Sequence, residues 1–382
     1  MAQLGRHVFF DRTLSSSGAQ SCADCHSPQH AFGPPGAAPA MSGGPMLARQ
    51  GLRAVPSLMY LERQPAFTIG PDDPESEGAA PGANAGANLV PQGGLFWDGR
   101  ADTLQSQALG PLLNPLEMDG GSIATVAAKL RRSAYAPLFA QLFGAAVFAQ
   151  PKVAVAEALF AVARFEFEDV AFHPYTSKYD AWLEGRARLS PAELRGLHLF
   201  EDPHGANCAA CHLDPPSADG LPPLFTDHQY EALGVPRNPQ VAANRDPAYV
   251  DLGICGPQRT DLKTQRQYCG MFATPTLRNV ATRHVFFHNG VYHTLAQVLD
   301  FYVERDAAPQ RIYPRGAGGK PRKFDDLPAA YRGNVDTTDA PFGRRPGEGP
   351  VLTAAEERDV IAFLRTLTDG YRPTAPSPGG PP

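Results

Sequence analysis

The chain has 382 residues, of which 43% are hydrophobic and 19% charged, and it carries a net charge of −5. This composition is typical of a soluble globular protein, and the charge argues against a general nucleic-acid binder and provides no basic patch for a membrane surface. No apolar run approaches the ~20 residues of a membrane helix, and the first residues lack the apolar core of a signal peptide.

The first motif in chain order has the spacing C-x-x-C-H, in the stretch "SCADCHSPQHAF" at 21–32, and it returns as "NCAACHLDP" at 207–215. This spacing is the attachment signature of c-type haem, in which two thiols bind the vinyl groups and the histidine binds iron. A thioredoxin-like pair does not need the histidine, and a zinc ribbon brings its two C-x-x-C pairs within ~15–20 residues. The sequence therefore predicts two covalent haems, attached through Cys22, Cys25, Cys208 and Cys211, with His26 and His212 as proximal ligands.

The two motifs belong to a longer internal repeat. In each copy a Gly stands four residues before a Thr-Leu pair that begins a predicted helix, and the Thr is a natural N-cap. The first copy also carries a Pro/Gly/Ala-rich insertion across 71–94. The matching segments are "HVFFD" (7–11) with "HLFED" (198–202), "VPSL" (55–58) with "TPTL" (274–277), and "FWDGRADTLQ" (96–105) with "FHNGVYHTLA" (287–296).

The repeat predicts a mostly α protein made of two related c-type cytochrome domains. Each is expected to surround one covalent haem and to carry long loops, because the sequence holds 37 Gly and 39 Pro. We expect an N-terminal domain at 1–172 and a C-terminal domain at 173–371, with the junction near 172–176. The Pro/Gly-rich tail at 372–382 is predicted to be disordered.

Alignment of the repeats on Gly99 and Gly290 places Pro111 in the first copy opposite Tyr302 in the second. If this position faces the iron, the second haem receives a phenolate oxygen and the first receives no ligand atom. The alternative for Tyr302 is a helix aromatic in the core.

Other ligands for the first iron are scarce. Between 27 and 172 the sequence has one histidine, His30, which is too close to His26 to reach across the ring. Methionines remain possible, although nothing singles one out: Met41, Met46, Met59 and Met118. An open iron is a site for peroxide or dioxygen, whereas electron-transfer haems are normally closed on both faces.

Peroxide activation also needs an acid–base group over the open face. Glu117, six residues past Pro111, is the best-placed carboxylate, and the alternative is a solvated loop residue. Gln107 is a candidate hydrogen-bond donor to a bound ligand. Trp97 is a candidate relay between the haems, with plain core packing as its alternative.

The two remaining cysteines, Cys255 and Cys269, lie 14 residues apart in a loop-like segment. They are consistent with a disulfide or with two buried thiols. Disulfides persist in oxidising compartments, so we expect a periplasmic protein whose leader is absent from this numbering.

The repeat and four segments resemble the di-haem cytochrome c peroxidase/MauG superfamily over roughly residues 4–370. These segments are "LGRHVFFD", "FWDGRA", "GPLLNPLEM" and "TPTLRNVATRHVFFHNG". The resemblance implies the MauG branch, in which the second haem has His–Tyr ligation and the first is five-coordinate. The resemblance implies that Tyr302 is the distal ligand of the second haem. It implies that Glu117 is the distal acid, Gln107 the distal amide, Pro111 the distal proline and Trp97 the inter-haem tryptophan.

Within this branch the chain is most similar to MbnH-like enzymes, through "LRAVPSLMYL", the Cys255/Cys269 segment and "VLDFYVERD" followed by "KFDDLPAAY". Two positions depart from the family pattern. Ala54 replaces an asparagine that contributes to an inter-haem calcium site, which leaves one calcium ion as an open expectation. Ala206 stands where MauG has a surface tryptophan that relays oxidising equivalents, so another exit would be needed.

Three functions follow from these expectations. The favoured one is a haem-dependent enzyme that uses hydrogen peroxide to form a high-valent bis-haem state and oxidises a tryptophan of a partner protein. The alternative is a di-haem peroxidase that reduces hydrogen peroxide to water with electrons from small redox proteins. A non-catalytic electron carrier is the third, and an open first haem argues against it.

Overall fold

The computed structural model describes residues 1–72 and 89–372. Most of the Pro/Gly/Ala-rich insertion predicted across 71–94 lies outside the described residues, and so does the tail at 372–382 apart from its first residue. The segments on either side of residues 73–88 pair as an antiparallel ribbon, β3 (Thr68–Pro71) with β4 (Leu89–Gln92). None of the described helices is both long and apolar enough to cross a membrane.

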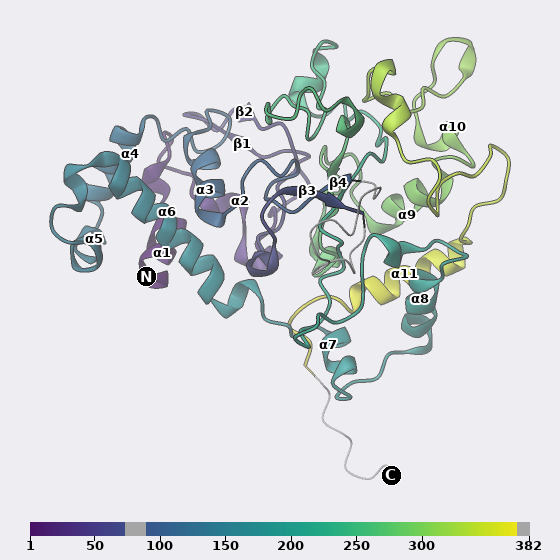
Figure 1. Cartoon of the computed structure of the whole chain (residues 1–382), viewed down its shortest axis with the longest axis horizontal. Coiled ribbons are helices and arrows are strands. Elements are labelled where there is room, and N and C mark those ends of the chain that lie inside the picture. The colour runs from purple at the N-terminus through teal and green to yellow at the C-terminus, as the bar shows by residue number, and fades with distance from the viewer. Residues whose placement is uncertain (73–88, 373–382) are drawn as a thin grey trace, which may run out of the picture.

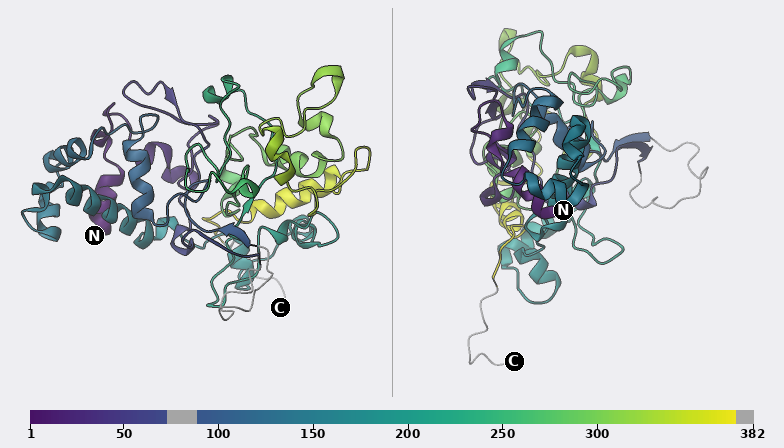
Figure 2. Two further views of the ribbon diagram at one scale, coloured as in Figure 1. Left: turned by 45° about the horizontal axis from the view of Figure 1, so that its top comes forward. Right: turned by 90° about the vertical axis from the view of Figure 1, so that its left-hand side faces the viewer.

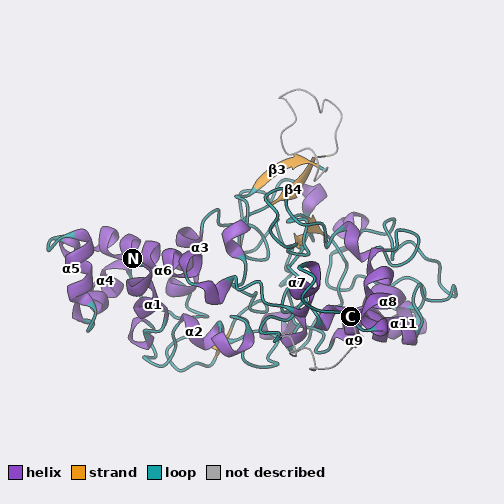
Figure 3. Ribbon diagram, turned by 90° about the horizontal axis from the view of Figure 1, so that it is seen from below, coloured by secondary structure: helices purple, strands orange, loops and turns teal. Residues whose placement is uncertain are grey.

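Helices and loops dominate the described part of the chain, and the strands are short (Figure 3). The other strand pairs are β1 (Ser42–Gly43) with β2 (Arg49–Gln50) and β5 (Tyr230–Glu231) with β6 (Phe272–Ala273). The helices are α1 (Ala2–Phe9), α2 (Cys22–Cys25), α3 (Leu104–Leu113), α4 (Ile123–Arg132), α5 (Ala136–Phe143), α6 (Pro151–Glu168), α7 (Lys178–Leu183), α8 (Pro191–Glu201), α9 (Leu295–Glu304), α10 (Pro309–Ile312) and α11 (Ala354–Arg365).

In the first half of the chain, α1 packs against the long helix α6 (Figure 1). A Cβ at Gly5 would lie 1.8 Å from the carbonyl oxygen of Ala161, so the two helices meet backbone to backbone. Beside this contact the ring of Phe9 packs edge-on against Phe165, with centroids 5.5 Å apart. Close helix contact therefore requires a residue without a side chain at position 5.

The second half repeats this contact with α8 and α11. A Cβ at Gly196 would lie 1.9 Å from the carbonyl oxygen of Asp359, and the ring of Phe200 lies 5.2 Å from that of Phe363. Gly5 and Gly196 each stand two residues before the histidine of the repeated "HVFFD" and "HLFED" segments. The duplication seen in sequence is thus a duplicated helix pair.

The turns before α3 and α9 also match closely. Gly99 and Gly290 both adopt positive φ, 65° and 62°, which glycine tolerates without strain. The N-cap residues Thr103 and Thr294 have almost identical backbone angles, and each hydroxyl accepts a hydrogen bond from the N–H three residues later. Each threonine therefore starts its helix as the repeat predicts.

Two large hydrophobic clusters fill the two halves, which lie side by side along the long axis (Figure 2). The first draws its buried residues from 4–172 and adds Leu224, and the second draws them from 179–367. The mostly helical architecture with little sheet agrees with the predicted fold class. The division into domains at 1–172 and 173–371 stays a proposal.

Candidate functional site

Each C-x-x-C-H motif lies against its own hydrophobic cluster, Cys22 against the first and Cys208 against the second. The two histidines are oriented in the same way. The Nδ1 of His26 lies 3.1 Å from the carbonyl oxygen of Phe32, and the Nδ1 of His212 lies 2.9 Å from that of Phe225. Such a bond fixes the tautomer that donates from Nδ1 and leaves Nε2 as the acceptor of a metal.

The protonation of the two histidines suits metal binding. Burial lowers the pKa of His26 and of His212 to about 4, so both imidazoles are neutral and able to bind iron. Burial raises the pKa of Cys22 and Cys208 to about 12, so both sulfurs are thiols at neutral pH. None of the four motif cysteines forms a disulfide.

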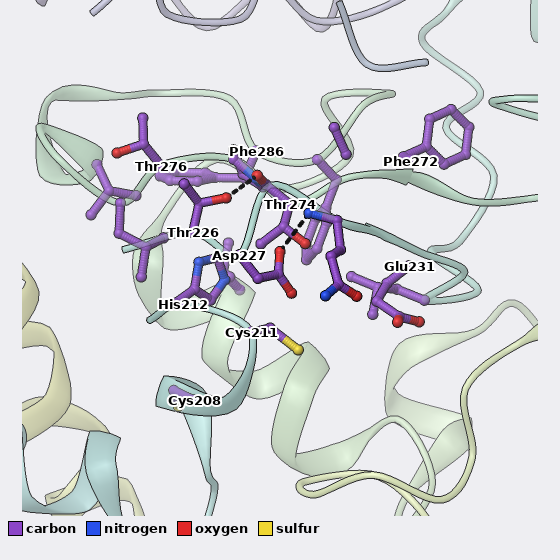
Figure 4. Close-up of a pocket in the computed structure, with 18 of the residues that line it drawn as sticks. Cys208, Cys211, His212, Thr226, Asp227, Glu231, Phe272, Thr274, Thr276 and Phe286 are labelled. Atoms are coloured by element: carbon purple, nitrogen blue, oxygen red, sulfur yellow. Dashed lines mark hydrogen bonds between the residues drawn. The ribbon is translucent and has the colours of Figure 1, made fainter. Parts of the chain in front are cut away.

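The second motif borders a cavity of about 770 Å³, within the size range of ligand and cofactor pockets. Cys208, Cys211 and His212 lie on one side of it (Figure 4), and Tyr302 of α9 also lines it. Burial raises the pKa of Tyr302, and the charges of Cys211 and Cys208 contribute to that rise, so the phenol lies near the two cysteines. A histidine nitrogen and a tyrosine oxygen on one mostly apolar cavity fit a haem ligated on both faces.

The equivalent helix of the first half, α3, has Pro111 in place of the tyrosine. Proline offers no side-chain donor atom. Glu117 follows α3, and its Oε1 accepts a hydrogen bond of 2.7 Å from Nδ2 of Asn114. Burial raises the pKa of Glu117, partly offset by Asn114 and by the charge of Arg100. Glu117 in turn helps to raise the pKa of Cys25, so the carboxyl lies near the first C-x-x-C-H motif.

The remaining residues predicted for the first site, Gln107 and the methionines, lie in different parts of the structure. Gln107, on α3, is buried and lines the large cavity. Met59 and Met118 are buried in the first hydrophobic cluster, whereas Met46 is 87% exposed.

Trp97 lies where the two halves meet and lines the cavity. Its indole N–H donates to the carbonyl oxygen of Ala54 at 2.7 Å, and its own carbonyl oxygen accepts from the N–H of Ala273. The N–H of Ala54 donates to the carbonyl oxygen of His288, which is the repeat equivalent of Trp97. A reciprocal pair of backbone bonds therefore holds the tryptophan at the junction.

Sequence reasoning missed His288, although "FHNG" aligned with "FWDG" pairs it with Trp97. Its ring stacks on Phe272 with centroids 3.5 Å apart, and burial lowers its pKa to about 4. Its Nε2 lacks a hydrogen-bond partner among the described residues and lies 3.9 Å from a carboxylate oxygen of Asp326. The alignment was the signal that could have found it.

Charged residues that the motifs did not reveal also line the cavity. Burial raises the pKa of Asp227 to about 6 and that of Glu231 to about 8, and Figure 4 shows both near Cys211. Burial lowers the pKa of Arg283 to about 10, and its guanidinium donates a hydrogen bond to the carbonyl oxygen of Val55 in the first half. These contacts join segments far apart in sequence, so no local pattern signals them.

Cys255 and Cys269 form a disulfide in the second half. Ala206, which the sequence comparison placed where MauG has a surface tryptophan, is buried. The carbonyl oxygen of Ala54, the position expected to affect calcium, is the acceptor for Trp97.

Known proteins share this architecture. The di-haem cytochrome c peroxidase family matches residues 1–188. The methylamine utilization protein MauG of Paracoccus denitrificans is 35% identical, covering 97% of this chain and 88% of that protein. The crystal structure of the diheme peroxidase BthA from Burkholderia thailandensis has a TM-score of 0.84 at 39% identity, covering 96% of this chain and 86% of that one. A MauG-like protein associated with microbial copper homeostasis has a TM-score of 0.64 at 27% identity, covering 96% and 89%.

Proposed function

The chain belongs to the di-haem cytochrome c peroxidase/MauG family and is a haem-dependent oxidoreductase, and from this premise we propose that it uses hydrogen peroxide to oxidise a tryptophan of a partner protein. The observation that carries the proposal is the difference between two equivalent helix positions. Pro111 in α3 offers no side-chain donor atom to an iron at the first motif, whereas Tyr302 in α9 would offer a phenolic oxygen to an iron at the second. The two haems therefore have different tasks.

When bound, the two haems supply the iron that reacts with peroxide and the capacity to hold two oxidising equivalents. His26 and His212 would hold the irons through Nε2, because the Nδ1 of each is directed at a backbone carbonyl. Glu117 takes a proton from one peroxide oxygen and returns it to the leaving oxygen. Asn114 orients that carboxyl, and burial raises its pKa above the ordinary value of a glutamate.

Trp97 is the residue we assign to charge sharing between the two sites. Its indole N–H is held by Ala54 of the first half and its backbone by Ala273 of the second, and the residue lines the cavity beside the second motif. Gln107 is assigned as the amide that hydrogen-bonds peroxide.

Two considerations favour protein oxidation over peroxide scavenging. An anionic tyrosine ligand lowers the reduction potential of a haem, which makes it a poor entry point for electrons from high-potential donors. MauG relatives also match nearly the whole chain. The working location that we propose is the periplasm, where the Cys255–Cys269 disulfide would persist.

A di-haem peroxidase fed by small redox proteins is the second candidate. The diheme peroxidase BthA is more similar to this chain than the MauG-like copper-associated protein, in both identity and TM-score. This likeness favours a peroxidase over the MbnH-like assignment within the family. Calcium between the haems stays a proposal in either case, with Ala54 offering only its backbone.

One addition of hydrogen peroxide to the fully oxidised protein separates the two functions. The proposed oxidase forms a long-lived species with a near-infrared charge-resonance band, and it needs no prior reduction. A peroxidase that must first be reduced shows no reaction under the same conditions, and that result would reject the proposal.

The Tyr302→Phe variant tests the ligand assignment. It should lose the long-lived species and keep both haems attached, as measured by haem staining and absorbance. Tyr292→Phe is the matched control, because this tyrosine packs against the same Phe287 ring at 5.7 Å but does not line the cavity. Normal formation of the species in Tyr302→Phe would show that Tyr302 is not the ligand.

A further inference from the structure

A chain of aromatic contacts leads from the second haem motif to helix α7. The Nδ1 of His212 lies 2.9 Å from the carbonyl oxygen of Phe225, and the Phe225 ring packs edge-on against Tyr179 with centroids 5.4 Å apart. The Tyr179 ring lies 5.3 Å from that of Trp182, one helical turn further on. These separations are typical of aromatic pairs in direct contact. The contacts are therefore continuous from the proximal histidine to Trp182.

The two ends of this chain differ in exposure. Tyr179 is only 3% exposed, whereas Trp182 is partly exposed on α7, which lies at the edge of the molecule (Figure 1). Trp182 is one of the two tryptophans in the sequence, and the other, Trp97, is buried at the junction of the halves. Ala206 is buried and has no oxidisable side chain. Trp182 is thus the tryptophan that an external protein can approach.

Oxidation of a buried tyrosine requires a proton acceptor, because the phenol loses its proton with the electron. The charges of Asp214, Glu201 and Asp180 help burial to raise the pKa of Tyr179, while Arg278 opposes them. These three carboxylates therefore lie within electrostatic range of Tyr179. Glu201, at the end of α8, is exposed and exchanges protons with solvent.

We propose that Tyr179 and Trp182 form the exit by which oxidising equivalents leave the second haem for a partner protein. The proposal rests on the proposed function and extends it to the route. Tyr179 gives an electron towards His212 through Phe225 and gives its phenolic proton to one of the neighbouring carboxylates, Asp214, Glu201 or Asp180. Trp182 then reduces the tyrosyl radical, which recovers a proton, and an aromatic side chain of the partner gives an electron to Trp182. Hydrogen peroxide is the terminal oxidant, and two passages account for its two equivalents.

The route predicts where the enzyme damages itself when no partner is present. After repeated single equivalents of hydrogen peroxide, peptide mapping by mass spectrometry should find one or two added oxygen atoms on Trp182. In Tyr179→Phe the modification of Trp182 should fall several-fold, because phenylalanine is not oxidised at these potentials. The long-lived oxidised species should form as before in this variant and decay several-fold more slowly.

Replacements of Trp182 separate a redox role from a packing role. Trp182→Phe should lengthen the life of the oxidised species, and Trp182→Tyr should restore wild-type decay, since tyrosine is oxidisable. Tyr135→Phe is the control, because this tyrosine stacks on Phe139 in the first half, away from the route. Met46, 87% exposed, reports oxidation by free peroxide and should be modified equally in all variants.

Three results would overturn the route. One is an unmodified Trp182 in the wild-type protein, another is equal Trp182 modification in Tyr179→Phe, and the third is an unchanged decay in Trp182→Phe. If the wild-type protein forms no oxidised species with peroxide, the proposed function fails and the route fails with it. If the oxidised species forms normally and decays at the wild-type rate in both Tyr179→Phe and Trp182→Phe, the route is rejected and the proposed function is not.

Discussion

At the scale of single residues, two carboxyl groups of the first half whose pKa burial raises, Glu117 and Glu166, have different expected roles. Glu117 is the one to which we assign proton transfer with peroxide. Only its carboxylate form accepts a proton, and burial raises its pKa. The rate of reaction with peroxide should therefore rise with pH until that raised pKa is passed. Glu117→Gln should be slower by about 10²–10⁴-fold and lose this pH dependence.

Stopped-flow absorbance of the haems at several pH values measures both effects. Glu348→Gln, which changes an exposed carboxyl, should retain the wild-type rate and pH profile. A Glu117→Gln variant that reacts at the wild-type rate would remove this residue from the mechanism.

Glu166 presents the opposite case, a buried carboxyl to which we assign no step. It lies on α6, its Oε2 has no hydrogen-bond partner among the described residues, and burial raises its pKa from 4.5 to about 8. The pKa of Glu166 is higher in the folded state than in the unfolded state. Below about pH 4.5 the carboxyl is protonated in both states and does not reduce the free energy of unfolding, which then falls as the pH rises from 4.5 to about 8. The loss is on the order of 3–5 kcal/mol.

Glu166→Gln should remove that loss. Its melting temperature should exceed that of the wild-type protein above pH 8 and approach it near pH 4.5, as followed by circular dichroism of the haem-loaded protein. An equal difference at both pH values would show that the carboxyl does not titrate as burial predicts.

At the scale of elements, the glycines at the two helix crossings offer a paired test. A Cβ at Gly5 or Gly196 would meet a carbonyl oxygen of the facing helix at under 2 Å, so each helix pair must move apart. Gly5→Ala and Gly196→Ala should each cost about 1–3 kcal/mol or more in urea unfolding. Gly36→Ala is the control, because a Cβ there meets nothing within 4 Å. A loss of stability in only one of the two glycine variants would mean that the two helix crossings are not equivalent.

These elements also show how far the sequence predicts the structure. The repeat located both caps, Thr103 and Thr294, and paired Pro111 with Tyr302, because N-caps and glycine turns are local and leave a short pattern. The partners of Trp97 could not be predicted in this way. Ala54 and Ala273 meet at Trp97 only when the halves pack, and such long-range contacts leave no periodic signal.

At the scale of the whole molecule, a buried arginine connects the two halves beside Trp97. Arg53 donates to Asp98 of the first half at 2.7 Å and holds both carboxylate oxygens of Asp251 in the second half, each at 2.7 Å. All three side chains are almost fully buried. Residue 54, next in the chain, accepts the indole N–H of Trp97. The same arginine therefore fixes the junction and the position of the tryptophan.

Arg53→Met keeps the length of the side chain and removes its charge, which leaves Asp251 buried without its bidentate partner. Removing one member of a buried ion pair costs about 3–5 kcal/mol, so urea unfolding should show a loss of that size. Arg12→Met is the matched control, because the Arg12–Asp24 pair has its arginine 61% exposed and is worth about 0–1 kcal/mol. Since the junction also positions Trp97, the near-infrared band after peroxide should weaken in Arg53→Met and stay unchanged in Arg12→Met. Equal losses of stability in the two variants, or an unchanged band in Arg53→Met, would show that the halves are held and coupled by other contacts.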